Sequence, residues 1–355
     1  MNRTTKIFTQ TLLNWYERHG RKHFPWQNPR SDYRVWVSEI MLQQTQVKTV
    51  IPYFTRFIER FPDIQALANA AEDDVFSHWS GLGYYSRARN LHKTAKIIHT
   101  QYANRFPNDW EQLKSLPGIG PSTAAAIASL AYNQPTAILD GNVKRVLSRY
   151  FLIDGFSDQA DVQRKLWQLA NECMPHEHCA DYTQAIMDMG ATCCTGKNPS
   201  CAICPLQSSC LAYQTNDVAN YPQKKPKTPR PTRFQQFLLL HTTERTIYLE
   251  KRPPTGIWGG LWCLPCIEMD DNPETYVQHH YNIQPTHVKK IMTMKHSFSH
   301  FHLHISVVSL QSKASGDAVI ECSGRWFSDD ELNKIGLAKP VTAIIDHFRI
   351  DGAEA

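Results

Sequence analysis

Four closely spaced cysteines are the clearest chemical feature of the chain. Cys194, Cys201, Cys204 and Cys210 lie within 17 residues and are separated by six, two and five residues. Soft metals and iron–sulfur clusters prefer cysteine thiolates, so this spacing predicts one compact ligand loop. A structural zinc ion is the competing interpretation, but such sites usually combine two Cys-x2-Cys pairs and this loop has one. The spacing therefore favours an iron–sulfur cluster.

A glycine-rich turn before a predicted helix is the second feature. The segment LPGIGPSTA, residues 116–124, contains Gly118 and Gly120. Because glycine has no Cβ, such a turn lets backbone N–H groups approach a phosphate at the positive N-terminus of the helix. Contacts of this kind hold a nucleic acid by its backbone and read no bases. The alternative is an ordinary turn that only starts a helix.

Two carboxylates stand where acid–base or cation chemistry is plausible. Asp140 precedes a predicted helix in LDGNVKRV, as a simple N-cap or as an ionised group facing a developing cation. Glycosidic cleavage through an oxocarbenium-like transition state needs such a group. Glu39 is the one acid in the apolar stretch WVSEIMLQQTQ. It therefore lies either on the solvent-exposed face of a helix or in the interior with a raised pKa. Lys144, after Asp140, either neutralises a phosphate or is solvated.

Length and composition limit the class of protein. With 355 residues, 42% of them hydrophobic, the chain is long enough for two domains. Its formal charge of +5 is too small to indicate nucleic acid by itself. The first twenty residues lack the apolar core of a signal peptide, and no apolar run reaches the roughly 18 residues of a membrane span. We expect a cytoplasmic protein that does not contact membranes, whose ten cysteines serve metal chemistry rather than disulfides.

Three regions must position these residues. Residues 1–215 carry apolar side chains at helical spacing between Pro and Gly breaks, which predicts a helical domain with the glycine turn inside a helical hairpin at about 107–132. Residues 216–233 include YPQKKPKTPRPTR, a basic, proline-rich run without acids, which predicts an extended linker. Residues 234–355 alternate in strand-like patterns, which predicts a separate α/β domain.

With the cysteine loop, the hairpin and the segments around both carboxylates, the chain resembles MutY-type adenine DNA glycosylases over almost its full length. The resemblance implies an α plus α/β fold: an all-helical, two-lobed helix-hairpin-helix domain with a [4Fe-4S] loop at 194–210, then a smaller Nudix-like α/β domain. One [4Fe-4S] cluster on the four loop cysteines is implied. So are a role for Glu39 in protonating the adenine ring and a role for Asp140 in stabilising or capturing the sugar cation.

The same resemblance assigns residues to DNA. Gln43, Gln44 and Tyr84 match positions that fill the gap left by a flipped base or contact the opposite strand. The other implied DNA contacts are Arg87, Gly118, Gly120, Ser122 and Lys144. Bifunctional members of the superfamily carry a catalytic lysine two residues after the second hairpin glycine. Because Ser122 stands there, we expect a monofunctional glycosylase that leaves the strand uncut.

The C-terminal region resembles the Nudix-like module of the family, which detects 8-oxoguanine opposite the adenine. The implied lesion-reading residues are His296, Phe298, Ser299 and His300, with Phe298 beside the damaged base and Ser299 supplying hydrogen bonds. The glutamate run that binds Mg²⁺ in catalytic Nudix domains is missing after Trp262, so we expect no pyrophosphatase activity.

The resemblance implies a monomer, associated with the nucleoid in a bacterium, that binds double-stranded DNA with A:8-oxoguanine or A:G mispairs in base excision repair. The linker is a candidate docking segment for repair or replication proteins. Two alternatives stay open. A bifunctional endonuclease III-like glycosylase and lyase would share the hairpin, Asp140 and the cluster. A non-catalytic, lesion-binding iron–sulfur protein would not need Glu39 and Asp140 together.

Overall fold

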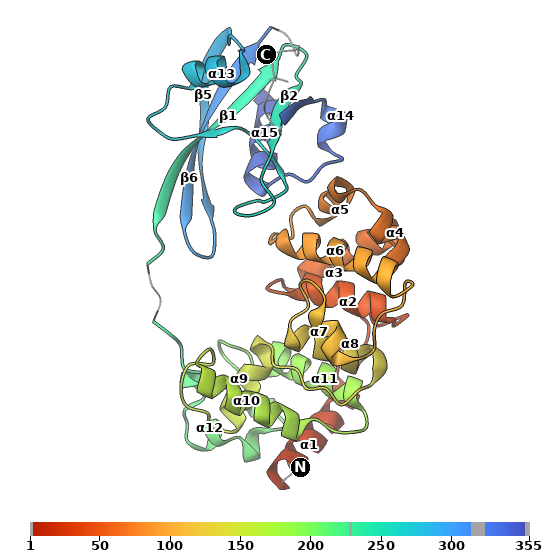
Figure 1. The fold of residues 1–355 in the computed structure, drawn as a ribbon. Coiled ribbons are helices and arrows are strands. Elements are labelled where there is room, and N and C mark those ends of the chain that lie inside the picture. Colours follow the sequence, from red (N-terminus) through yellow and green to blue (C-terminus); the bar gives the residue numbers. More distant parts are fainter. Residues whose placement is uncertain (1–2, 227–228, 314–323, 352–355) are drawn as a thin grey trace. The chain divides into compact units, whose positions relative to one another are not determined.

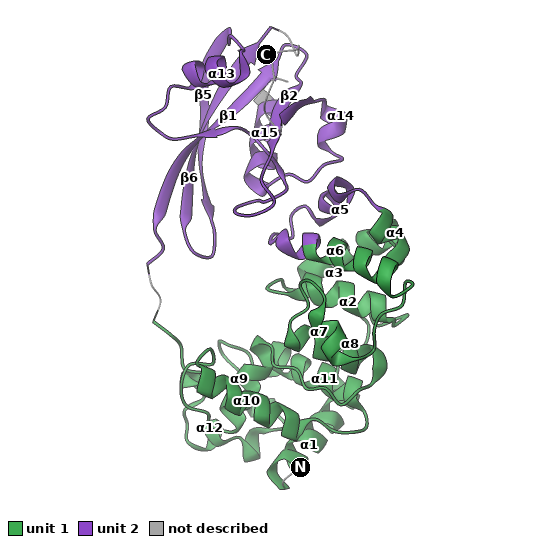
Figure 2. Cartoon of the chain, in the orientation of Figure 1, with its two compact units in different colours: residues 1–69, 90–227 green, residues 70–89, 228–355 purple. Residues whose placement is uncertain are grey.

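The chain divides into two compact units (Figure 2). The computed structural model describes residues 3–226, 229–313 and 324–351. Unit 1 comprises Met1–Asn69 and Asn90–Lys227, and unit 2 comprises Ala70–Arg89 and Thr228–Ala355. The two units are described separately below.

Unit 1 is built from helices (Figure 1). Those that lie in it wholly or in part are α1 (Arg3–His19), α2 (Asp32–Leu42), α3 (Val47–Arg60), α4 (Ile64–Asn69), α6 (Ser86–Gln101, from Asn90), α7 (Trp110–Ser115), α8 (Pro121–Tyr132), α9 (Gly141–Tyr150), α10 (Ala160–Cys173), α11 (Cys179–Asp188) and α12 (Leu211–Gln214).

Helices α2 and α8 form the centre of unit 1, and their sequences explain why. Residues Ala124–Leu130 of α8 are all buried, and six apolar residues of α2 are buried as well. A helix that is apolar on every side must be enclosed by other elements, and α2 packs against both α8 and α3. The N-cap Ser31 starts α2 by accepting a hydrogen bond from the backbone N–H of Arg34 at 3.2 Å. Glu39 is thus carried on a helix fixed from several sides.

The core of unit 2 is a seven-stranded sheet with the order β3-β2-β1-β6-β5, in which β4 also pairs with β1 and β7 with β2. Strand β1 runs parallel to β6, and β5 pairs antiparallel with β6 at the edge. The strands are β1 (Thr232–Thr242), β2 (Ile247–Lys251), β3 (Trp262–Cys263), β4 (Cys266–Ile267), β5 (His287–Ser297), β6 (His302–Ser312) and β7 (Gly324–Phe327). The helices of this unit are α5 (Glu72–Trp79), α13 (Pro273–Tyr281), α14 (Asp329–Leu332) and α15 (Lys339–Asp351).

The predicted architecture is confirmed: a helical domain with a helical hairpin is followed by an α/β domain. The boundaries differ in two places. Strand β1 already begins at Thr232, inside the predicted linker. Residues 70–89, placed in the helical region by the sequence, belong to unit 2, where the Asp73 carboxylate pairs with Lys251 at 3.1 Å and the Tyr85 hydroxyl donates to the Leu337 carbonyl at 3.0 Å. Within the described residues, no helix is long and apolar enough to cross a membrane.

Candidate active site

A cavity of about 680 Å³ in unit 1 brings together five of the residues predicted from the sequence. They come from the end of α2, the start of α8 and the residue before α9, and they are Glu39, Gln43, Gln44, Ser122 and Asp140. Segments about one hundred residues apart in the chain therefore meet at one hollow. Both candidate catalytic carboxylates border it.

Glu39 sits on the last turns of α2 and is half-buried, because one side of it faces the cavity. Burial raises the pKa of its carboxyl to about 7, and the negative charge of Asp140 adds to the rise. Among the described residues, none donates a hydrogen bond to the Glu39 carboxyl. Desolvation without donors favours the neutral acid, so Glu39 keeps its proton to a higher pH than an ordinary glutamate does.

Asp140 is the N-cap of α9, as expected. Its Oδ1 accepts a hydrogen bond from the backbone N–H of Val143 at 2.8 Å, and its Oδ2 accepts one from the Asn142 side chain at 3.2 Å. We expected the helix start to keep this group ionised. Burial raises the pKa of Asp140, and the hydrogen bonds that favour its ionised form, together with Arg145, oppose this rise.

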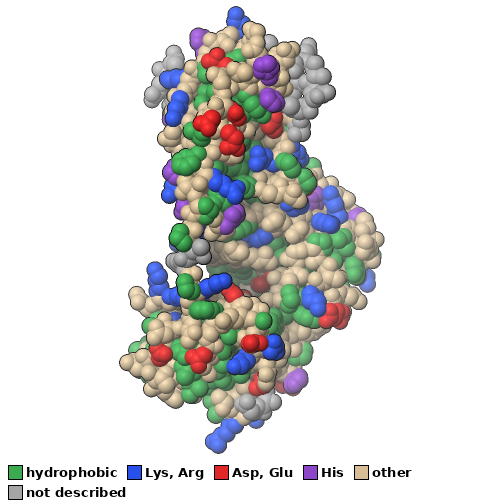
Figure 3. All heavy atoms as spheres, turned by 60° about the vertical axis from the view of Figure 1, so that its left-hand side comes forward, with side chains coloured by type: hydrophobic (Ala, Val, Ile, Leu, Met, Phe, Trp, Pro, Cys, Tyr) green, Lys and Arg blue, Asp and Glu red, His purple; other side chains and the backbone are tan. Residues whose placement is uncertain are grey.

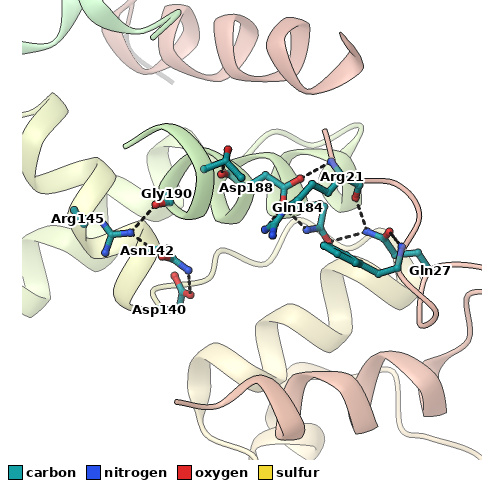
Figure 4. Close-up of polar contacts among 10 residues, drawn as sticks. Arg21, Gln27, Asp140, Asn142, Arg145, Gln184, Asp188 and Gly190 are labelled. Atoms are coloured by element: carbon teal, nitrogen blue, oxygen red, sulfur yellow. Dashed lines mark hydrogen bonds and ion pairs between the residues drawn. The ribbon is translucent and has the colours of Figure 1, made fainter. Parts of the chain in front are cut away.

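A chain of hydrogen bonds leads from Asp140 through Asn142 and Arg145 to the cysteine loop, and Figure 4 shows it as far as Gly190. The Oδ1 of Asn142 accepts from Arg145 Nη2 at 2.8 Å. The Arg145 guanidinium also donates to the carbonyl oxygens of Gly190, at 2.7 Å, and Cys194, at 2.8 Å. Two planar polar groups, the Asn142 amide and the Arg145 guanidinium, therefore connect a candidate catalytic carboxylate with the backbone of a predicted cluster ligand.

A second polar group lies on the other side of the cavity, and our sequence reasoning did not find it. Arg21 donates to Asp188 Oδ1 from Nε and Nη2, at 2.9 and 2.7 Å, and Asp188 is fully buried. Gln184 donates to the same oxygen at 2.9 Å, and Gln27 donates to Gln184 at 3.2 Å (Figure 4). The cavity wall here is made of Arg21, Phe24, Trp26, Gln184 and Met187.

The only hint of this wall in the sequence is Asp188, an acid in the apolar stretch AIMDMG. A buried carboxylate needs a cationic partner, but nothing in the local sequence identifies Arg21, 167 residues away, as that partner.

The hairpin consists of α7 and α8 and the turn between them. Gly118 has a φ of +76°, and a Cβ there would lie 2.7 Å from the Cβ of Asn90, so the fold itself requires glycine. At Gly120, by contrast, a Cβ would meet no described atom within 4 Å. The absence of a side chain at Gly120 thus leaves the N-terminus of α8 open to an approaching group.

Ser122 and Lys144 are already engaged within the protein. The hydroxyl of Ser122 accepts a hydrogen bond from the backbone N–H of Leu139 at 3.1 Å, which ties the hairpin to the segment that leads into Asp140. The Lys144 ammonium pairs with Asp158 at 3.2 Å. A phosphate that bound Lys144 would have to share it with this exposed carboxylate.

The four predicted ligand cysteines line one small cavity of about 30 Å³ together with Arg149 and a fifth cysteine, Cys193. A π-helical turn, Met189–Cys193, leads from α11 into this loop. The buried Arg149 donates from Nη1 to the sulfur of Cys194 at 3.3 Å and to the Thr195 carbonyl at 2.7 Å. Among the described residues, no three Cys, His, Asp or Glu side chains are placed to hold a single metal ion.

In unit 2, the segment 81–89 exposes the side chain of Tyr84 and buries that of Arg87. Tyr84 has a φ of +51° and its side chain is 48% exposed, as expected for a residue that meets a ligand. Arg87, whose expected contact with DNA stays a prediction, is engaged within the protein. It is buried, and its guanidinium donates to the carbonyls of Leu82, at 3.1 Å, and Gly83, at 3.0 Å. Arg87 holds the turn that presents Tyr84, because buried carbonyls at a glycine turn need donors.

The predicted lesion-reading residues lie at the β5–β6 hairpin of unit 2. Ser299 and His300 are exposed, and the Ser299 hydroxyl lies 3.3 Å from His300 Nδ1. Phe298 is half-buried in an aromatic cluster: its ring stacks on Phe301 with centroids 4.5 Å apart and lies 4.6 Å from His296. Trp258, which the sequence did not single out, completes the cluster at 5.3 Å from Phe298.

Comparison with known proteins gives matches along both units. Residues 37–172 match the HhH-GPD superfamily of base excision DNA repair proteins, and residues 236–347 match the NUDIX domain. The chain is 41% identical over 348 residues to the adenine DNA glycosylase of Buchnera aphidicola subsp. Schizaphis graminum, covering 98% of this chain and 100% of that protein. It is 31% identical to the adenine DNA glycosylase of Homo sapiens, covering 97% of this chain and 73% of that protein.

Among solved structures, a thermostable thymine-DNA glycosylase superposes with a TM-score of 0.55 at 28% identity, covering 60% of this chain and 98% of that one.

Proposed function

The chain belongs to the adenine DNA glycosylase family and so removes adenine from DNA in base excision repair. We propose that it hydrolyses the N-glycosidic bond of an adenine paired with 8-oxoguanine or guanine, and that it leaves the DNA strand intact. The observation that carries this proposal is the cavity bordered by two carboxylates of different character, Glu39 and Asp140.

Glu39 is the proton donor in this proposal. Adenine is a poor leaving group as an anion, so a proton must reach the ring as the glycosidic bond breaks. A carboxylic acid with an ordinary pKa would seldom be protonated at neutral pH. A pKa of about 7 keeps about half of the enzyme in the acid form near pH 7.

Asp140 faces the opposite requirement. It must be ionised to stabilise the positive charge that develops on the sugar. The two hydrogen bonds it accepts stabilise its charged form, whereas Glu39 accepts none among the described residues. When one proton is shared between two nearby carboxyls, it therefore resides on Glu39.

Strand cleavage by a lyase route would need an amine that attacks the sugar. Ser122, which lines the cavity, has none, and the Lys144 ammonium is paired with Asp158. The hydroxyl of Ser122, at the position where bifunctional members of the superfamily carry the catalytic lysine, supports a monofunctional enzyme over the bifunctional alternative.

The donor set of the loop fits a [4Fe-4S] cluster, which Cys194, Cys201, Cys204 and Cys210 would hold as thiolates. A bound cluster would cross-link the loop and supply an electron-transfer centre. The chain's own contribution is the shell around the ligands: Arg149 donates to the Cys194 sulfur, and Arg145 donates to the Cys194 carbonyl. Such donors fix ligand orientation.

Lesion recognition is proposed for the loop that carries His296, Phe298, Ser299 and His300. Ser299 and His300 are exposed at the tip and offer polar atoms to a base edge. Phe298 offers a ring face, supported from behind by Phe301. Aromatic support of this kind suits contact with a base that has left part of its stack.

A single-turnover incubation with a duplex containing one A opposite 8-oxoguanine, analysed with and without alkali, tests the proposal. Strand scission only after alkali is the expected result. Scission without alkali would favour the bifunctional alternative. The same assay with A opposite guanine and A opposite thymine measures the preference, and equal rates on all three duplexes would contradict lesion recognition.

A further inference from the structure

One face of the β1–β6–β5 sheet is apolar and covered at one end of the strands, and polar and open at the other end. Registered partners in neighbouring strands point to the same face, so Leu238, Val308 and Lys290 share a row at one end. At that end, Leu238, Leu240, Val308 and Leu310 pack in the core together with Val277 and Tyr281 of α13. Helix α13 has nine residues, about 13 Å, whereas the strands have eleven, about 36 Å. One such helix cannot cover the whole face.

The other end of the same face is polar and open. Its rows are Phe234–His304–Lys295 and Thr232–His302–Ser297. Phe234 is 55% exposed, its ring lies 5.1 Å from that of His304, and Lys295 and Ser297 are exposed too. We name this end, with the nearby Arg230, the cationic face: Arg230, Phe234, Lys295, Ser297, His302 and His304.

Charge on these strands is of one sign. Strands β1, β5 and β6 contain no Asp or Glu, and neither do residues 218–231 before β1. In Figure 3, Lys, Arg and His side chains lie on the lower part of unit 2, and the acidic side chains of that unit lie higher in the view, among further basic ones. Within the described residues, Lys295 makes no ion pair. Burial, and then the positive charges of Lys295 and Arg230, lower the pKa of His302. The face is therefore a region where an anion is electrostatically favoured.

The cationic face is held next to the β5–β6 loop. Arg230 donates from Nη1 to the carbonyl of Phe298 at 3.2 Å, and the Ser297 hydroxyl lies 2.9 Å from His302 Nδ1. Ser297 and His302 are the residues on either side of the loop. A strand whose base reached the loop would bring its phosphates to these side chains.

We propose that the cationic face binds the phosphate backbone of the DNA strand whose base the 298–301 loop contacts. DNA is the occupant because the family acts on DNA, and because an exposed Lys, a half-buried His pair and a serine hydroxyl are donors suited to phosphate oxygens. Which DNA strand lies on this face depends on the lesion recognition proposed above. The binding of phosphate to the face does not depend on it.

The proposal is tested by comparing the DNA binding of two variants, Lys295→Gln and its matched control Lys290→Gln. Both residues are exposed lysines on β5 that point to the same face, but Lys290 lies at the end covered by α13. Binding is measured over a range of salt concentrations, with an undamaged duplex and with a duplex carrying 8-oxoguanine opposite a 2′-fluoro-substituted adenosine that resists excision. Loss of one phosphate contact should lower the slope of log K against log salt by about 0.9 and weaken binding roughly five- to tenfold at 0.1 M salt.

We expect Lys295→Gln to weaken both duplexes by the same factor and Lys290→Gln to weaken neither. An unchanged salt slope in Lys295→Gln, or an equal effect of Lys290→Gln, overturns the proposal. A loss confined to the 8-oxoguanine duplex overturns it too, since Lys295 would then act through the loop. If the enzyme shows no preference for 8-oxoguanine while the slope still falls, lesion recognition fails and the cationic face stands.

Discussion

Glu39 and Asp140 border one cavity, but hydrogen bonds from described residues reach the carboxyl of Asp140 alone. Burial raises the pKa of both groups, and the donors around Asp140 oppose the rise there. Two carboxyls with similar chemistry thereby acquire different preferred protonation states.

The pH dependence of adenine excision should reflect this difference. Glu39 acts in its protonated form, so the single-turnover rate should fall as the pH rises through about 7. Asp140 acts in its ionised form, so the rate should also fall in acid, with a midpoint above the ordinary aspartate value of 3.8. Rates measured from pH 4 to pH 9 check both limbs. A rate that stays constant from pH 6 to pH 9 contradicts the role of Glu39 as the acid.

Replacing Glu39 should separate activity from binding. Glu39→Gln keeps the size of the side chain but cannot deliver a proton, so excision should slow by roughly 10² to 10⁴. Binding to the mispaired duplex should change little. Glu59→Gln, an exposed position on α3, is the control and should excise adenine normally. Loss of binding in Glu39→Gln, equal to the loss of activity, would show a structural role instead.

The same substitution should stabilise the protein at high pH. The folded-state pKa of Glu39, about 7, lies above the value of 4.5 for the free side chain, so its contribution to stability is complete below pH 4.5 and is lost as the pH rises to 7. The loss amounts to at most about 3 kcal/mol. Glu39→Gln should therefore unfold at a higher temperature than the parent at pH 8, and this advantage should disappear near pH 4.5. Thermal unfolding at the two pH values measures it.

Gly190 offers a test of the hydrogen-bond chain that reaches Asp140. A Cβ at Gly190 would lie 2.6 Å from the Cβ of Asn142 and 3.1 Å from its backbone, so Gly190→Ala must displace Asn142, which donates to Asp140. Excision should slow, and the acid limb of the pH profile should move upward because the ionised form of Asp140 loses a donor. Gly196→Ala is the control, since a Cβ there meets no described atom within 4 Å. Equal behaviour of the two variants would contradict the prediction.

Iron content tests the cysteine loop. The purified protein should be yellow-brown and contain four irons per chain, as a [4Fe-4S] cluster requires. Cys204→Ser should reduce both colour and iron, because serine is a poor ligand for iron in such clusters. Cys266→Ser, a cysteine of unit 2 outside the loop, should retain both. Zinc in place of iron, in a colourless protein, would identify the competing site.

Arg87 should matter for the turn that presents Tyr84. Arg87→Gln removes the donors to the Leu82 and Gly83 carbonyls, and an unsatisfied buried carbonyl costs about 1–3 kcal/mol. We expect lower thermal stability and slower unstacking of a 2-aminopurine placed at the target position, read by its fluorescence. Arg105→Gln, at an exposed position, is the control. A variant that weakens binding and lowers the salt slope without loss of stability would restore Arg87 to a direct phosphate contact.

The sequence alone determined much of the local structure, because local structure follows from short-range patterns. The LPGIGPSTA string predicted a turn between two helices, and α7 and α8 lie there. Asp140 before GNVKRV predicted an N-cap, and its carboxylate accepts from the Val143 N–H. Alternation in residues 301–307 predicted a strand, which is part of β6. Each of these rests on the preference of a few neighbouring residues for one backbone conformation.

The tertiary structure decided which residues share a site and which side chains are already engaged in contacts within the protein. No spacing in the sequence brings Arg21 to Asp188, because this ion pair depends on the packing of the loop after α1 against the end of α11. Arg87 looked like a free cation, and burial against the carbonyls of its own turn made it a structural donor. The protonation of Glu39 was open for the same reason: its pKa depends on how much water the folded chain removes from its carboxyl, and only the packing around the cavity sets that amount.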